Sequence, residues 1–121
     1  TGAPSIPQYL VAMLNGLPVG SVRLAADDFG GLRPEYFPWL ATLYVCPEYR
    51  RRGVGSRLIR ACVELAAAGG HENLYLWAAS RQAEELYSRL GWVCVERTAA
   101  PFGKKAGEEV PIMKAPPATT S

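Results

Sequence analysis

The chain has 121 residues, a formal net charge of +2, and hydrophobic side chains at 49% of its positions. This length supplies material for one hydrophobic core, so the sequence predicts a single domain over residues 1–121. The net charge is too small to indicate nucleic-acid binding by itself. No run approaches the roughly 20 apolar residues that cross a bilayer. The amino end lacks the layout of a signal peptide, so we expect a cytoplasmic protein without a membrane partner.

Three cysteines, Cys46, Cys62 and Cys94, are spread widely along the chain without a Cys-x-x-Cys pair. An odd, dispersed set indicates neither a disulfide framework nor a zinc site. We therefore predict buried free thiols and no bound metal.

The amino-terminal third of the chain has the pattern of β-structure. Two apolar runs, residues 9–14 and 19–24, flank Asn15-Gly16, a pair that tolerates positive φ, and this combination predicts a β-hairpin. Residues 27–38 contain several glycines and prolines and predict a loop, which leads into an apolar strand over residues 39–45.

The rest of the chain alternates between helical and strand patterns. Helical spacing of apolar residues predicts a helix from Val54 that Gly69-Gly70 ends, followed by a buried strand over residues 74–78. A second helix is predicted over residues 83–90, with Ser80 as its cap. We expect residues 93–97 and 110–114 to close the sheet as an antiparallel pair, and residues 115–121 to form a disordered tail. These elements give a mixed α/β sheet with helices packed on it.

One segment, residues 43–55, carries a strand through a basic loop into the first turn of a helix. Gly53 and Gly55 let the backbone approach a ligand, and the first N–H groups of a helix have no partner within it. The arginines at positions 50–52 add positive charge, so the segment predicts a phosphate or pyrophosphate site. A Walker loop is excluded because no lysine occurs between residues 1 and 103, and a Rossmann fingerprint is excluded because Leu58 stands where its third glycine belongs.

The pattern Arg-x-x-Gly-x-Gly, formed by Arg50, Gly53 and Gly55, resembles the pyrophosphate loop of the GNAT superfamily of acyl-coenzyme A-dependent N-acetyltransferases. A second signature lies downstream, where Tyr87 precedes the pair Gly91-Trp92 by four residues, as in the second helix of that family. The resemblance covers about residues 8–114. The family's usual first strand and two helices have no counterpart, so we expect a fragment, a wall supplied by a partner chain, or an open acceptor site, and the exposed sheet surface favours a homodimer.

The resemblance implies a GNAT-like fold in which two core strands splay apart and hold acetyl-CoA, with no metal. The pantetheine arm would contact the backbone of residues 43–45, and the pyrophosphate would lie on the basic loop and the helix start. Ser80 would serve either as the helix cap or as a cofactor contact. The cofactor-binding residues expected in this way are Leu43, Tyr44, Val45, Arg50, Arg51, Arg52, Gly53, Val54, Gly55, Ser56 and Ser80.

The implied function is acetyl transfer from acetyl-CoA to a primary amine by direct attack in a ternary complex, with Tyr87 as the general acid. The general base stays open among Asp27, Asp28, Glu35 and a water chain. These carboxylates mildly favour a cationic acceptor, either a small molecule or a peptide. The alternative is a non-catalytic acyl-CoA-binding or partner-dependent subunit. Nucleic-acid binding by the arginines is disfavoured, because Glu48 and Glu64 flank the basic stretch and lysine is absent from it.

Overall fold

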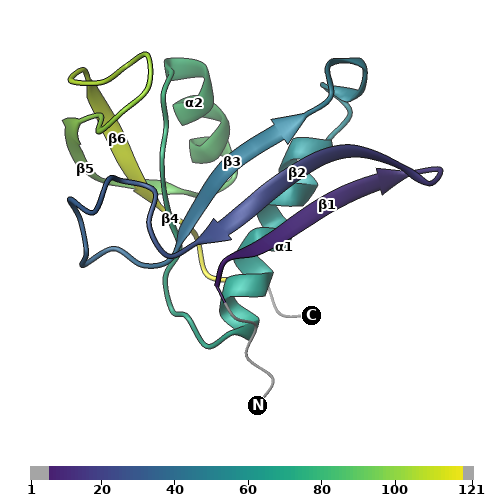
Figure 1. The fold of residues 1–121 in the computed structure, drawn as a ribbon, viewed down its shortest axis with the longest axis horizontal. Coiled ribbons are helices and arrows are strands. Elements are labelled where there is room, and N and C mark those ends of the chain that lie inside the picture. Colours follow the sequence, from purple (N-terminus) through teal and green to yellow (C-terminus); the bar gives the residue numbers. More distant parts are fainter. Residues whose placement is uncertain (1–5, 119–121) are drawn as a thin grey trace.

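The computed structural model describes residues 6–118, which fold into a six-stranded sheet with two α-helices packed on it (Figure 1). The strand order is β1-β2-β3-β4-β6-β5, and of these neighbours only β3 and β4 run parallel. The predicted mixed α/β sheet is therefore confirmed. The elements are β1 (Gln8–Leu14), β2 (Leu17–Ala25), β3 (Trp39–Val45), the short 3₁₀ helix η1 (Pro47–Tyr49), α1 (Val54–Ala68), β4 (Tyr75–Trp77), α2 (Arg81–Arg89), β5 (Val93–Ala99) and β6 (Glu109–Lys114).

The predicted hairpin is formed by β1 and β2, whose ladder closes at the pair Leu14 and Leu17. Asn15 and Gly16 connect the strands with φ angles of 52° and 79°. Positive φ at both central residues is the geometry of the turns that match the twist of a two-residue hairpin. The hairpin places β1 at one edge of the sheet.

Strand β3 has the predicted bounds, and it contains a β-bulge that the sequence did not indicate. Its pairing with β2 moves from Arg23–Ala41 to Ser21–Tyr44, so two residues of β3 stand opposite one of β2. Thr42 lies within the bulge with a φ of 51°. A bulge bends its strand and turns the following residues in a new direction, so the last part of β3 is redirected just before the basic loop.

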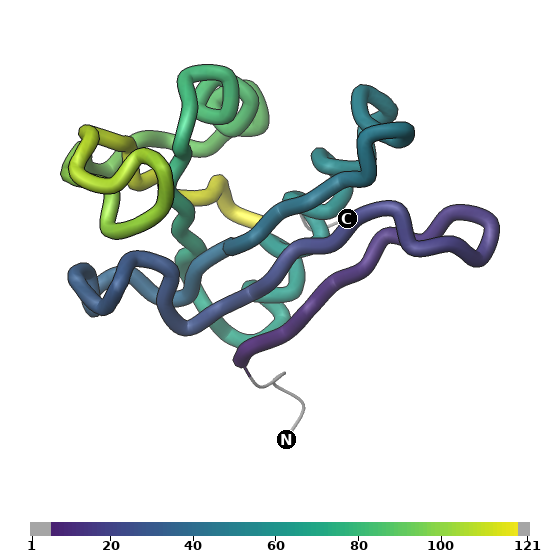
Figure 2. The backbone as a smooth tube through the Cα atoms, turned by 45° about the horizontal axis from the view of Figure 1, so that its top comes forward, coloured from purple at the N-terminus to yellow at the C-terminus, as the bar shows by residue number. Residues whose placement is uncertain are grey.

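Strands β3 and β4 part soon after they meet. Their parallel ladder contains one pair, Trp39 and Tyr75. Beyond it β3 runs away from the chain that follows β4 toward α2, and the divergence is visible in two views (Figures 1 and 2). On its other side β4 pairs with β6, which also pairs with β5. The closing antiparallel pair is thus confirmed, and β6 fills the space between β4 and β5.

Helix α1 presents the predicted apolar stripe to the sheet. Leu58, Ile59, Cys62 and Ala66 are buried within it. They form a core cluster with sheet residues such as Leu76 and with Tyr87 from α2, so both helices pack toward the same core. This spacing of apolar residues every three or four positions is what holds a helix against a sheet.

The opposite face of the sheet is covered at one end by the loop between β2 and β3. Phe29 of this loop stacks on Trp39, with ring centroids 5.6 Å apart and planes 9° from parallel. Tyr36 stacks on Tyr75 at 4.6 Å. These aromatic pairs build a second buried cluster, which holds the loop against β3 and β4 at the point where the two strands part.

Two predictions about the outer parts of the chain need correction. Cys62 is buried, but Cys46 is half-buried and Cys94 is exposed, because β5 lies at the edge of the sheet with most of its side chains open to solvent. The predicted disordered tail starts too early, since the Ala115 amide donates to the Leu74 carbonyl at 2.9 Å. Residues 119–121 lie outside the described residues. Within residues 6–118, neither helix has the length and hydropathy needed to cross a bilayer.

Candidate functional site

A groove with a volume of about 570 Å³ lies where the end of β3, the start of α1 and one side of α2 come together. Most of the residues expected to bind a cofactor lie along it, although they come from separate elements. The lining residues are Leu43, Tyr44, Val45, Arg50, Arg51, Gly53, Gly55, Ser56, Leu86 and Arg89.

The start of α1 forms one end of the groove. Gly53 occupies the N-cap position with a φ of 83° and a ψ of 4°, a left-handed conformation that suits glycine, and it has no side chain to cap the helix. The first helical bond runs from the Arg57 amide to the Gly53 carbonyl at 3.1 Å. The amides of the first turn therefore lack intrahelical partners, and together with the helix dipole they favour an anion.

The arginines of the basic loop are held in different ways. The Nε of Arg50 donates to the Val45 carbonyl at 2.8 Å, and its guanidinium lies 5.7 Å from the centre of the Tyr44 ring. Arg51 also lines the groove. Arg52 instead lies over the ring of Tyr49, 5.4 Å from its centre, and does not line the groove. Two of the three arginines expected at the anion site thus line the groove.

Two further candidates lie outside the groove. Val54 is half-buried against the main core. Ser80 caps α2, because its Oγ accepts a hydrogen bond from the Ala83 amide at 3.1 Å. Ser80 also lines a separate hollow of about 250 Å³ at the end of β4. The sequence left two roles open for Ser80, and the structure shows it as the N-cap of α2.

Sequence reasoning missed two groove residues, Leu86 and Arg89, which α2 contributes. They lie three positions apart, so they share one face of the helix. A signal was present, because Arg89 is a cation in the same helix as Tyr87 and adds to the charge of the basic loop. The sequence alone did not indicate which side of α2 faces that loop.

Tyr87 is packed between α2 and the core. Its side chain is 8% exposed and belongs to the cluster that lies under α1. Burial raises the pKa of its phenol to about 12. Removal of water disfavours the charged phenolate, so the hydroxyl remains protonated throughout the neutral range. Such a group can donate a proton, and it is adjacent in sequence to the groove residue Leu86.

The carboxylates considered as a general base differ in their surroundings. Asp27 accepts hydrogen bonds from the amides of Phe29 and Gly31, at 3.2 and 2.9 Å, and so shapes its own loop. Glu35 is exposed. Asp28 is half-buried, with its Oδ1 4.0 Å from the Arg23 guanidinium. Burial raises the pKa of the Asp28 carboxyl to about 6, although Arg23 opposes this shift.

A bidentate ion pair ties the same loop to β5. Arg33 donates from Nε to both oxygens of Glu96 at 3.0 Å, and from Nη2 to Oε2 at 2.6 Å. The hydroxyl of Tyr36 donates to the same carboxylate at 3.0 Å. The hydrogen bonds from Arg33 lower the pKa of Glu96. This network fixes the loop that covers β3 and β4 where they part.

A bulged strand that parts from its parallel neighbour, beside a glycine-started helix and a basic groove, defines the acyl-CoA N-acyltransferase fold class. A family model described as the acetyltransferase (GNAT) family matches residues 3–92. The chain belongs to this family, as its loop and second-helix signatures predicted.

Individual relatives are similar to the chain over part of their length. An uncharacterized N-acetyltransferase of Methanocaldococcus jannaschii is 30% identical over 86 residues, which are 69% of this chain and 38% of the relative. A GCN5-related N-acetyltransferase structure from Rhodopseudomonas palustris is 30% identical with a TM-score of 0.70, over 90% of this chain and 61% of that one. The chain thus spans less than two thirds of either protein.

Two more distant structures share the fold. A GNAT family acetyltransferase from Elizabethkingia anophelis, with acetyl-CoA bound, has a TM-score of 0.71 at 14% identity, over 90% of this chain and 75% of that one. A ribosomal-protein alanine N-acetyltransferase from Escherichia coli has a TM-score of 0.71 at 20% identity, over 95% and 72% of the two chains.

Proposed function

We propose that this protein is an acetyl-CoA-dependent N-acetyltransferase that acts on a primary amine. The observation that carries the proposal is the single groove that joins the end of β3, the uncapped start of α1 and the helix that bears Tyr87. Its members come from positions 43 to 89, so their convergence is a property of the fold and not of one local motif.

The groove has an apolar part and a basic part that match the two halves of the cosubstrate. Leu43 and Val45 offer apolar surface and redirected backbone to a pantetheine arm. Arg50, Arg51 and the first-turn amides of α1 offer charge and hydrogen-bond donors to a pyrophosphate. An acetyl-CoA complex of a family structure with the same fold supports this cosubstrate.

The proposed reaction takes place in a ternary complex. A neutral primary amine attacks the thioester carbonyl, a C–N bond forms, and the C–S bond breaks. The attacking nitrogen releases one proton as the amide forms. Tyr87 donates its proton to the leaving thiolate, and the phenolate regains a proton from solvent after product release. A phenol that stays protonated at neutral pH meets the first requirement of this role.

The acceptor is proposed at the level of a primary amine on a small molecule or a peptide. The relatives do not narrow the choice of acceptor, because of these three only the Escherichia coli enzyme is named for its acceptor. A ribosomal-protein alanine among them makes a peptide amino terminus a reasonable member of the first screen.

The first experiment is calorimetric titration of the protein with acetyl-CoA, beside a variant that carries Arg50→Ala and Gly53→Ala. Arg57→Ala is the matched control, because Arg57 is an exposed arginine of α1 that does not line the groove. We expect binding to the wild type and to the control, with a loss of at least about tenfold in the double variant. Equal binding by all three proteins would refute the assignment of the groove.

A non-catalytic acyl-CoA-binding or partner-dependent subunit is the second candidate. It is favoured by the low exposure of Tyr87. Acetyl-CoA binding without thiol release in the presence of an amine panel would select this candidate.

A further inference from the structure

We infer that the carboxyl group of Asp28 accepts the proton that the amine loses before it attacks acetyl-CoA. The inference rests on the proposed function and identifies one base among the carboxylates that the sequence left open. It begins with the position of Asp28 relative to the opening between β3 and β4.

The contacts of Asp28 reach both neighbours of β3, the strands β2 and β4, where the sheet opens. The ladder between β3 and β4 ends at the pair Trp39–Tyr75. Two residues beyond it on β4, the indole N–H of Trp77 donates to the Asp28 carbonyl at 2.9 Å. Two residues beyond it on β3, Ala41 pairs with Arg23 of β2, whose guanidinium faces the Asp28 carboxylate at 4.0 Å. Asp28 is therefore anchored over β4 and linked back across β3 to β2.

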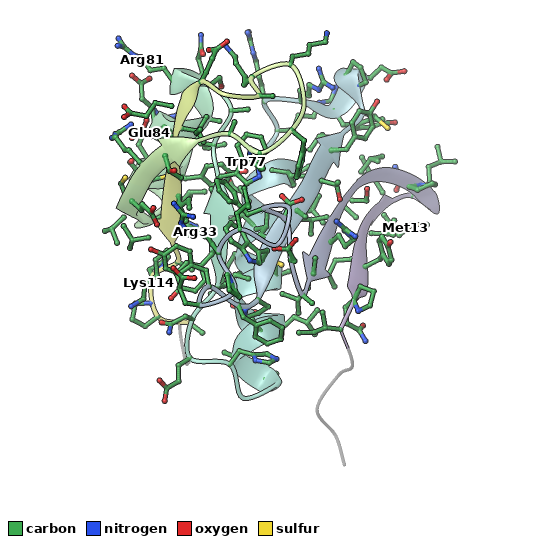
Figure 3. All side chains as sticks on the ribbon, turned by 60° about the vertical axis from the view of Figure 1, so that its left-hand side comes forward. Met13, Arg33, Trp77, Arg81, Glu84 and Lys114 are labelled. Carbon is green, nitrogen blue, oxygen red and sulfur yellow. The ribbon has the colours of Figure 1, made fainter. Side chains whose placement is uncertain are left out.

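The surroundings of Asp28 lie on the opposite side of the sheet from those of Tyr87. Phe29, the next residue, and Trp77 belong to the aromatic cluster under the loop, whereas Tyr87 belongs to the cluster under α1. Figure 3 shows Trp77 in the middle of the loop-covered side, with Arg33 of the same loop nearby. An amine that reaches the opening from the loop side would meet Asp28, while the thiolate would leave toward α2. Proton acceptor and proton donor are then on opposite sides of the reacting carbon.

The charged groups that face Asp28 make it suitable for a proton acceptor. Arg23 approaches from β2, Asp27 lies beside it in the loop, and Trp77 supplies an uncharged N–H from β4. Burial raises the pKa of the Asp28 carboxyl to about 6, so the group is ionised at neutral pH and yet more basic than an exposed aspartate. A general base is most effective when its pKa lies near the working pH.

Arg23 provides a second observation at the same place. Its Nε is enclosed and has no hydrogen-bond partner among residues 6–118. An enclosed donor without a partner normally needs an explanation. The Nε belongs to the side chain that pairs with Asp28, so the two charged groups are partly withdrawn from solvent together.

The other carboxylates near the loop have different roles. Asp27 is used by two backbone amides, Glu35 is exposed, and Glu96 is held by Arg33 and Tyr36, with a pKa that these hydrogen bonds lower. A carboxylate stabilised in its ionised form is a weaker base. Asp28 is the carboxylate of this group whose environment strengthens its basicity.

The proton transfer balances without any further reactant. The acceptor ammonium gives one proton to the Asp28 carboxylate, which becomes a neutral carboxylic acid, and the amine lone pair forms the C–N bond. The C–S electron pair leaves with the thiolate, which takes the proton of Tyr87. The attacking nitrogen loses its second proton as the amide forms, a proton returns to the Tyr87 phenolate through solvent, and release of the Asp28 proton to solvent restores the enzyme.

The test is the pH dependence of thiol release with Asp28→Asn, Asp28→Glu and, as the matched control, Glu35→Gln. The probes are acetyl-CoA with tyramine, glycinamide and spermidine, which are protonated at neutral pH, and with methoxyamine, which is already neutral there. We expect kcat/KM for wild type to fall below about pH 6, the pKa of Asp28. In Asp28→Asn we expect this decline to vanish and the rate with the protonated amines to fall by roughly 100-fold or more.

Methoxyamine separates a proton acceptor from a residue that only positions the substrate. Because it carries no ammonium proton that must be removed before attack, its rate should be nearly unchanged in Asp28→Asn, and Asp28→Glu should recover part of the rate with the other amines. Glu35→Gln should match the wild type, and all variants should bind acetyl-CoA equally in calorimetry. An equal loss with all four amines, or wild-type rates in Asp28→Asn, would overturn the inference.

Failure of the proposed function would have a different signature. The wild type would bind acetyl-CoA but release no thiol with any of the four amines, and the role of Asp28 would be refuted together with it. If Asp28→Asn does not fold, Asp28→Glu decides the matter, because a longer carboxylate should retain a decline of rate at acidic pH but at a shifted position. A decline that does not shift in Asp28→Glu would count against Asp28.

Discussion

The ring of Tyr87 lies 5.7 Å from the ring of Trp92, with the two planes tilted by 59°. The backbone joins the same two residues, because the Trp92 amide donates to the Tyr87 carbonyl at 3.0 Å. The turn at Gly91 thus folds the end of α2 back on the tyrosine that the proposed reaction uses as its acid. Ring packing and hydroxyl chemistry are separate properties of Tyr87 and can be tested separately.

Replacement of Tyr87 by phenylalanine should keep the ring contact with Trp92 and remove the proton donor. We expect thermal stability and acetyl-CoA affinity to remain close to the wild type, and turnover to fall by about 100- to 10,000-fold. The measurements are thermal unfolding, calorimetry and thiol release. If the wild type is active and turnover is unchanged in Tyr87→Phe, another group protonates the thiolate. If turnover is negligible in both proteins, the result favours the binding-subunit candidate.

Asp28→Asn should stabilise the fold near neutral pH. The pKa of Asp28 is raised from 3.8 to about 6 in the folded protein, so the folded state retains a proton that the unfolded state releases. Stability from this group is therefore present below about pH 4 and lost as the pH rises through 6. Asp28→Asn lacks this loss, so its free energy of unfolding should exceed that of the wild type by about 2–3 kcal/mol at pH 7.

Urea unfolding of the two proteins at about pH 4 and pH 7 measures this difference. At the lower pH the wild-type carboxyl is protonated and resembles the amide, so the two curves should nearly coincide. A difference that is the same at both values would mean that burial does not raise the pKa of Asp28.

Gly53 and Gly55 should respond differently to alanine. Gly53 has a φ of 83°, so alanine there would strain the backbone by roughly 1 kcal/mol. Gly55 has ordinary helical geometry, and an added Cβ would meet Val45 Cγ2 at 3.7 Å, a normal contact. Gly55→Ala should leave stability unchanged or slightly higher, because alanine favours helices.

Gly55→Ala should nevertheless weaken acetyl-CoA binding, because the new methyl group enters the groove beside Val45. Calorimetry and thermal unfolding of both variants, with Gly16→Ala in the distant hairpin turn as a control for glycine strain, separate the two effects. Full affinity in Gly55→Ala would place the ligand away from the start of α1.

Loss of the Arg33–Glu96 pair should loosen the loop between β2 and β3. In Arg33→Gln we expect faster hydrogen exchange over residues 27–38 with little change in α1, because the pair links this loop to β5. Lys105→Gln is the control, since its partner Glu108 lies 3.8 Å away within another loop and both side chains are largely exposed. Equal exchange in wild type and Arg33→Gln would mean that the aromatic stacking alone holds the loop.

The homodimer predicted from the sequence stays a prediction, and β1 is the surface where we expect a second copy to bind. Tyr9, Val11 and Met13 alternate along this edge strand and are 66%, 54% and 58% exposed. Met13→Glu should give a monomer in sedimentation across a concentration series in which the wild type dimerises. Leu32→Glu is the control, because Leu32 is 58% exposed on a loop away from β1.

Local patterns predicted most elements well. Strand β3 has the predicted bounds because a proline and the basic loop flank its apolar run, and α1 buries the predicted stripe because that stripe was complete. The bulge at Thr42 was missed, since it depends on pairing with β2 and not on the residue itself. The position of β6 between β4 and β5 was also missed, because pairing between strands distant in sequence leaves no local signal.

The candidate site was predicted only in part, because some of its residues meet through contacts that leave no local signal in the sequence. The loop residues followed from a contiguous pattern, and the structure brings most of them into one groove. Leu86 and Arg89 required knowledge of which side of α2 faces β3. Asp28 could be named only as one of several carboxylates, because its burial and its pairing with Arg23 arise from the packing of a loop against two strands.

The place of β6 has a consequence for how the protein is made. Strands β1 to β3 and helix α1 can associate as soon as they leave the ribosome, because their contacts are near in sequence. Strand β4 has only one paired residue on the β3 side and waits for β6 on the other, and β5 depends on β6 entirely. Strands β4, β5 and β6 therefore complete their pairing only when Glu109–Lys114 has been synthesised, so a ribosome stalled before that point would hold a basic loop already formed beside a strand β4 with one paired residue.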